Sequence, residues 1–75
     1  MKIRIELDSI DLCQILDGLE ARAEAWEKTA IYHRTGESPP DFIVEECSNE
    51  HEANGIARHY RSIIAKIRKQ REDQT

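Results

Sequence analysis

The stretch LCQILDGLEARAEAWEKTAIYH, residues 12–33, decides the fold because its apolar and aromatic positions recur at alternating intervals of four and three residues. Those positions are Leu12, Leu16, Leu19, Ala23, Trp26, Ala30 and His33. This spacing places one continuous stripe along an α-helix. Asp8 or Ser9 is a suitable N-cap and Gly36 is a suitable stop, so the sequence predicts a helix over residues 9–34.

A second amphipathic segment covers residues 48–71. Its stripe consists of Ala53, Ile56, Tyr60, Ile63 and Ile67, broadened by Ala57 and Ile64. Ser48 or Asn49 can cap this helix, and acidic residues in its first turn favour the helix dipole. The connection at 35–47 contains Gly36 and two consecutive prolines, which indicate a loop. Two amphipathic helices joined by a loop predict an antiparallel hairpin.

The amino-terminal stretch KIRIELD, residues 2–8, alternates charged and apolar side chains. A period of two predicts a half-buried β-strand over residues 1–8. The β-prone run FIVEE, residues 42–46, offers it a possible second strand just before the second helix. The expected fold is therefore mainly α, an amino-terminal strand followed by a helical hairpin. It forms a single domain over 1–75, with residues 72–75 as a frayed tail.

Length and composition predict self-association. The chain has 75 residues, of which 39% are hydrophobic, and a formal net charge of -4. A domain of this size buries a small fraction of its surface, and its single strand has too few partners, so a homo-oligomer, dimer or higher, is expected. No apolar run is long enough to cross a membrane, and no apolar leader precedes the strand. We expect a protein of the cytoplasm with both cysteines reduced.

Six of the eleven Lys and Arg residues fall within residues 57–71. Helical geometry puts Arg61 and Arg68 on the edge of the hairpin that also carries the acidic flank of the first helix. The flank consists of Asp17, Glu20, Glu24 and Glu27. Counting back from the loop predicts Arg61 near Glu20 and Glu24, and Arg68 near Asp17. Part of the positive charge is therefore expected to be structural.

The opposite edge carries small residues and cations but, apart from Asp11 near its end, no acid. Its members are Gly18, Arg22, Ala25, Thr29 and Tyr32 with Gly55, His59, Lys66 and Gln70. One interpretation is an anion-binding site, in which Arg22 and Lys66 contact phosphate or carboxylate while Thr29, Tyr32 and His59 supply hydrogen bonds. The alternative is that the charged side chains are only solvated and the small residues accommodate a neighbouring protomer.

Metal and catalytic motifs are weak. Cys47 and His51 form one C-x3-H pair, whereas a structural zinc site has four ligands, so no metal and no cofactor are expected. Cys47 or Cys13 could act as a nucleophile only beside a histidine that a third group orients. The carboxylates follow the solvated face of a helix rather than a cleft. The sequence therefore favours a protein that is not an enzyme.

The stretches LDGLEARAEAWEKTAIYHRTG, residues 16–36, and FIVEECSNEHEANGIARHYRSIIAKIRKQ, residues 42–70, resemble a family of short phage and prophage proteins without a settled activity. The resemblance implies a setting in the host cytoplasm, where such proteins block or sequester host components, including nucleotide signals of antiviral immunity. The leading hypothesis is an anti-defence protein that sequesters a small anionic, nucleotide-like ligand between helices or protomers.

Two alternatives stay open. One is a protein–protein inhibitor or adaptor that covers a basic host surface with its acidic helix face. The other is a small DNA-binding regulator, which the basic run suggests and in which the strand would place Lys2, Arg4 and Glu6 against DNA. The acidic charge of the chain counts against the second, because phosphates repel it. Nucleic acid is therefore the less favoured partner.

Overall fold

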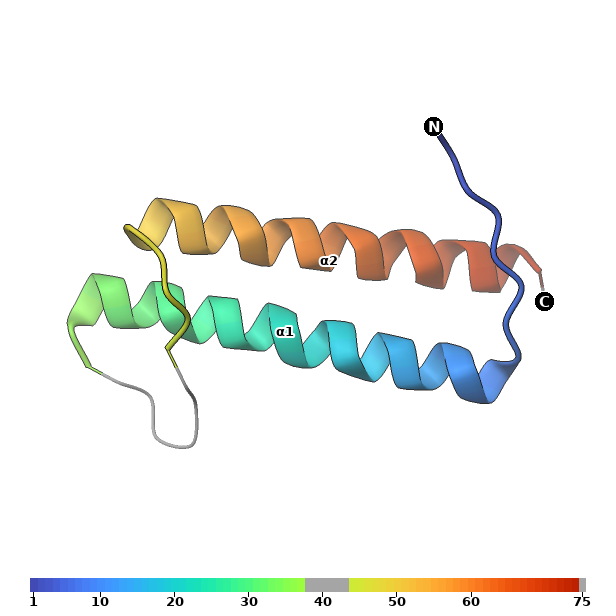
Figure 1. Ribbon diagram of the computed structural model, residues 1–75, viewed down its shortest axis with the longest axis horizontal. Helices are drawn as coiled ribbons and strands as arrows, with labels where there is room; N and C mark the ends of the chain where they lie inside the picture. The colour runs from blue at the N-terminus through green and yellow to red at the C-terminus, as the bar shows by residue number, and fades with distance from the viewer. Residues whose placement is uncertain (38–43, 75) are drawn as a thin grey trace.

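The computed structural model describes residues 1–37 and 44–74, which form two antiparallel helices lying side by side (Figure 1). Helix α1 spans Ser9–Thr35 and helix α2 spans Glu50–Asp73. The hairpin measures 44 × 27 × 17 Å. The predicted helical hairpin is confirmed, and the helix bounds differ from the predicted ones by no more than two residues. Neither helix is long and apolar enough to cross a membrane, as judged over the described residues.

Local side-chain chemistry sets the helix ends. The Asp8 carboxylate accepts a hydrogen bond from the Asp11 backbone N–H at 2.9 Å and caps α1. The Asn49 side chain does the same for Glu52 in α2, also at 2.9 Å. Gly36 ends α1 in the left-handed region with φ 79°, and its N–H donates to the Tyr32 carbonyl at 2.7 Å. A side chain at position 36 would be strained there.

The core is the single seam between the helices, and it has two parts that share Tyr60. Near the loop, the buried residues are Trp26, Ala30, Ala53 and Ala57, packed against Cys47, Ile56 and Tyr60. Near the chain termini, the buried residues are Leu16, Ala23 and Ile64, packed against Leu12, Leu19, Tyr60 and Ile67. The predicted stripe of α1 is confirmed. That of α2 is rotated towards Ala57 and Ile64, because Ile63 is only half-buried.

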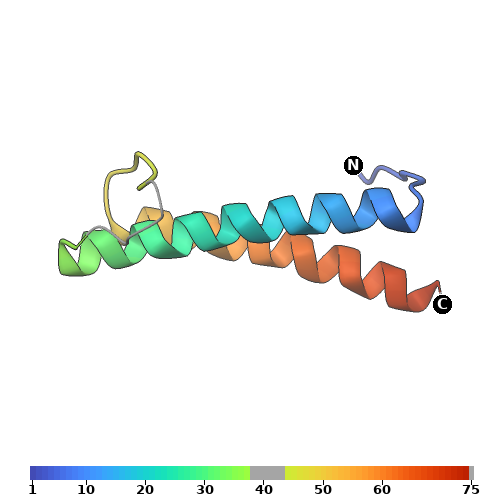
Figure 2. The same cartoon turned by 90° about the horizontal axis from the view of Figure 1, so that it is seen from below.

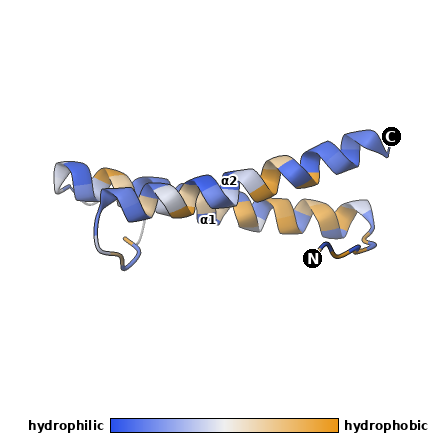
Figure 3. Cartoon of the chain, turned by 90° about the horizontal axis from the view of Figure 1, so that it is seen from above, coloured by the Kyte–Doolittle hydropathy of each residue, from blue (hydrophilic) through white to orange (hydrophobic). Residues whose placement is uncertain are grey.

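The two helices diverge towards the end of the hairpin that carries both termini, which we call the open end (Figures 1 and 2). Alanines from both helices meet near the loop, and small side chains allow backbones to approach closely. Towards the open end, Leu16 and Ile64 hold the backbones farther apart. Figure 3 shows that the first turns of α1, at this end, are predominantly hydrophobic.

The strand predicted over residues 1–8 is not seen in the structure of the single chain. Residues 1–8 are exposed, and no strand occurs in 1–37 or 44–74. A strand needs a partner, and the described part of the chain supplies none. Phe42 and Ile43 of the FIVEE run lie outside the described residues, and residues 44–46 are not a strand. The predicted tail starts too early, since α2 continues to Asp73.

The burial of Ile64 leads to a test of the seam. Ile64 is 2% exposed, so Ile64→Ala should lower the free energy of unfolding by roughly 2 to 5 kcal/mol. Ile31, 39% exposed on α1, is the matched control, and Ile31→Ala should change stability little. Urea denaturation followed by circular dichroism measures both. Equal losses for the two variants would contradict the assignment of the seam.

Candidate functional site

Ion pairs between the two helices line one edge of the hairpin. The Arg61 guanidinium donates to both carboxylate oxygens of Glu27, at 3.0 and 2.7 Å, and Arg68 pairs with Glu20. The predicted acidic flank is therefore correct, and Arg61 lies close enough to Glu20 and Glu24 to feel their charge, but the ion-pair partners differ from the predicted ones. Each arginine pairs about one turn closer to the loop than counting back from the loop indicated. The connection between the helices is long, so packing of Tyr60 and Ile64 sets the register instead.

The ion pair also shifts the acid–base properties of its members. Hydrogen bonding to Arg61 holds the pKa of Glu27 below its ordinary value of 4.5. The same hydrogen bond raises the pKa of Arg61, and the negative charges of Glu20 and Glu24 add to that effect. The positive charge of Arg61 is thus stabilised within the hairpin.

Near the loop, Glu45 covers the opposite edge of the hairpin, a contact that the sequence did not predict. The Arg22 guanidinium donates to the Glu45 carboxylate at 2.6 Å. Hydrogen bonding to Tyr60 and then to Glu45 raises the pKa of Arg22. The expectation of an edge without acids is therefore wrong in this half of the hairpin, because the segment before α2 brings a carboxylate to it.

Thr29 on the same edge is fully buried and fastens this segment to α1. Its hydroxyl donates to the Ala25 carbonyl at 2.8 Å and accepts from the Glu45 backbone N–H at 2.9 Å. Both of these bonds are internal, so the hydroxyl is committed to the fold. The structure gives Thr29 a packing role instead of an exposed position beside a ligand.

A cysteine–histidine pair lies at the loop end. Cys47 Sγ is 3.2 Å from His33 Nε2, and the His33 ring stands edge-on to Tyr32, with centroids 5.4 Å apart. The sequence missed this pair, although an antiparallel hairpin brings the end of the first helix near the start of the second. Among the described residues, no third group hydrogen-bonds to His33, and no three potential metal ligands cluster. The arrangement lacks the orienting group of a nucleophilic triad.

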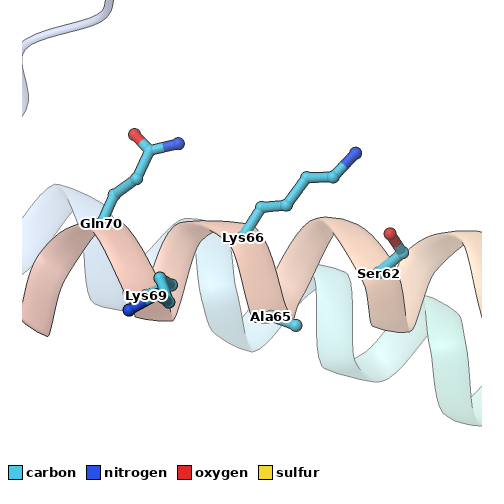
Figure 4. Close-up of a pocket in the computed structure, with 5 residues that line it drawn as sticks. All are labelled: Ser62, Ala65, Lys66, Lys69 and Gln70. Carbon is cyan, nitrogen blue, oxygen red and sulfur yellow. The ribbon is translucent and has the colours of Figure 1, made fainter.

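An exposed basic row follows α2 towards the open end. We define it as His59, Ser62, Lys66, Lys69 and Gln70. Ser62, Lys66, Lys69 and Gln70 with Ala65 line a shallow hollow of about 360 Å³. Figure 4 shows the side chains of Lys66 and Gln70 extending from the same side of the helix. Lys69 lies 3.5 Å from Asp73, whereas Lys66 has no ion pair within residues 1–37 and 44–74.

The structure thus divides the five predicted ligand-binding residues. His59 and Lys66 share the basic row, while Arg22, Thr29 and Tyr32 lie elsewhere, engaged with Glu45 or His33. No protein-family model matches the chain, and neither a curated protein nor a solved structure is detectably similar to it. Function is therefore inferred from the basic row and from the open end.

The Thr29 hydroxyl provides a test of how the segment before α2 is held. Thr29→Val should lower the free energy of unfolding by about 1 to 3 kcal/mol, because it leaves the Glu45 N–H without its acceptor. Amide hydrogen exchange at Glu45 should accelerate. Thr35→Val, at an exposed threonine of the same helix, is the control. Exchange at Glu45 that is unchanged by Thr29→Val would rule out this contact.

The Arg61–Glu27 pair predicts a dependence of stability on pH. Arg61 depresses the pKa of Glu27 in the folded chain only, so the folded state binds fewer protons than the unfolded state. The stabilisation is therefore present above pH 4.5 and is lost as the pH falls through the depressed value. The melting temperatures of wild type and Glu27→Gln should differ at neutral pH and converge in acid. Asp17→Asn, on the same flank, should show no such convergence, and a constant wild-type–Glu27→Gln difference would contradict the prediction.

Proposed function

We propose that this chain is a non-enzymatic binding protein that takes up a phosphate-bearing, nucleotide-like anion on the basic row of α2. The observation that carries the proposal is the state of Lys66. Its side chain is exposed, has no carboxylate partner in the described chain, and leaves the helix on the same side as Gln70 (Figure 4). A cation that no internal acid neutralises keeps the local field positive and attracts anions.

The row offers donors of the kind that phosphate oxygens accept. Lys66 and Lys69 supply ammonium donors, and Ser62 and Gln70 supply a hydroxyl and an amide from the same stretch of helix. Ala65 adds a small apolar surface to the lining of the hollow. The hollow is too shallow to enclose a nucleotide, so a second copy of the chain would have to close the site. Sequestration between protomers is the form of binding that these dimensions favour.

The alternative of an acidic adaptor surface has less support. Glu20 and Glu27, two members of the acidic flank, are paired with Arg68 and Arg61. Carboxylates that are already paired with arginines of the same chain present less charge to a basic partner. The resemblance to short phage proteins would give the proposed binding role its setting, the removal of a nucleotide signal in a host cell.

Calorimetric titration with a panel of linear and cyclic nucleotides, and with inorganic phosphate, tests the proposal. Wild type should bind at least one nucleotide, and Lys66→Gln should weaken that binding about tenfold or more, because a charged hydrogen bond is lost. Arg68→Gln is the matched control, since Arg68 is tied to Glu20 on the other edge. Absence of binding by wild type, or an equal loss in both variants, would overturn the proposal.

A further inference from the structure

The amino-terminal segment, residues 2–8, presents apolar side chains that nothing in the described chain covers. Ile3 is 76% exposed, Ile5 71% and Leu7 47%. No backbone hydrogen bond joins residues 2–7 to the remainder of 1–37 or to 44–74. The segment leaves the start of α1 at the open end (Figure 1), and Figure 2 shows it on the opposite side of α1 from the last turns of α2. It therefore has both an apolar face and an unpaired backbone edge available for a partner.

A groove of about 1500 Å³ lies between this segment and the open end of the hairpin. Apolar side chains from both helices contribute to it, namely Leu12, Ile15 and Ile67. Ile10 and Ile15, in the first two turns of α1, are themselves exposed. The groove thus provides apolar cover for an extended chain.

The charges of the segment identify the chain that fits there. From Lys2 to Asp8, the charged positions read positive, positive, negative, negative: Lys2, Arg4, Glu6 and Asp8. An antiparallel pair of two such segments, related by a two-fold axis at Ile5, sets Lys2 opposite Asp8 and Arg4 opposite Glu6. The same register sets Ile3 opposite Leu7 and Ile5 opposite itself. Every cation then faces a carboxylate, and every apolar residue faces an apolar one.

Other registers carry conflicts. Shifting the antiparallel pair by two residues places either Arg4 opposite Arg4 or Glu6 opposite Glu6 of the other copy. Shifting by one residue sets charged side chains opposite apolar ones. A parallel, in-register pair sets each charge against its own kind. Like charges directly opposite each other destabilise a strand pair, so the Ile5-centred register is the one that the sequence favours.

We propose that residues 2–8 form an intermolecular antiparallel β-ribbon with the same residues of a second copy of this chain, centred on Ile5. The apolar face of the ribbon would lie on the groove side chains of Leu12, Ile15 and Ile67. Asp8 can cap α1 and pair with Lys2 of the second copy at the same time, because one carboxylate oxygen accepts the capping hydrogen bond and the other remains for Lys2. The ribbon is argued from the charges of residues 2–8 and not from the anion site, although Lys66 and Gln70 line both the groove and the hollow.

Sedimentation velocity on the full chain at micromolar concentration tests the ribbon by charge reversal. Wild type should be a dimer. Arg4→Glu alone and Glu6→Arg alone should each weaken dimerisation about tenfold or more, since both place like charges opposite each other twice per dimer. An equimolar mixture of the two variants should dimerise, because all facing charges are then opposite in sign. The double variant Arg4→Glu/Glu6→Arg should dimerise for the same reason.

Matched controls are Arg34→Glu and Glu37→Arg, which change the net charge equally at the loop end and should leave the dimer intact. Lys69→Gln, which alters the hollow of the anion site but lies outside the groove, should also dimerise like wild type, which separates failure of the ribbon from failure of the anion site. A monomeric wild type would overturn the proposal. So would a mixture that stays monomeric, or single variants that dimerise as wild type does, since assembly would then use another face.

Discussion

The constraint on which this structure depends is that two helices share one seam. Each helix can bury only the stripe that faces the other, so seven apolar residues make up the entire buried hydrophobic core of the described chain. Within the seam, packing takes precedence over hydrogen bonding, because the Trp26 indole N–H is buried with no partner among the described residues. Such a group carries a desolvation cost that close packing of the ring has to offset. The register of the seam then determines which charges meet.

The division of positive charge along α2 follows from that register. Arg61 and Arg68 face the carboxylates of α1, while the row that includes Lys66 faces solvent. An exposed ion pair contributes little stability, but several along one edge favour one alignment over its neighbours. The two arginines thus help to align the helices, which leaves the basic row available for an external anion.

Local chemistry made the helices predictable from the sequence, and long-range contacts made the site unpredictable. The stripe of residues 12–33, the Asp8 and Asn49 caps and the Gly36 stop each depend on residues close in sequence. The contact of Glu45 with Arg22 and Thr29 depends on how a non-helical segment returns to α1, which periodicity does not encode. The strand predicted over residues 1–8 is not seen for a related reason, since alternation shows that a segment can pair but does not identify its partner.

The divergence of the two helices towards the open end also has a consequence for the order of folding. Alanine loses no side-chain rotamer freedom on burial, so the three alanines beside Trp26 near the loop add no such cost when the seam closes, whereas the open end must order several leucine and isoleucine side chains. We therefore expect closure to start near the loop and opening to start at the termini. Any molecule that clamps the open end acts on contacts formed last, so it would prolong the lifetime of the folded hairpin without hastening its formation.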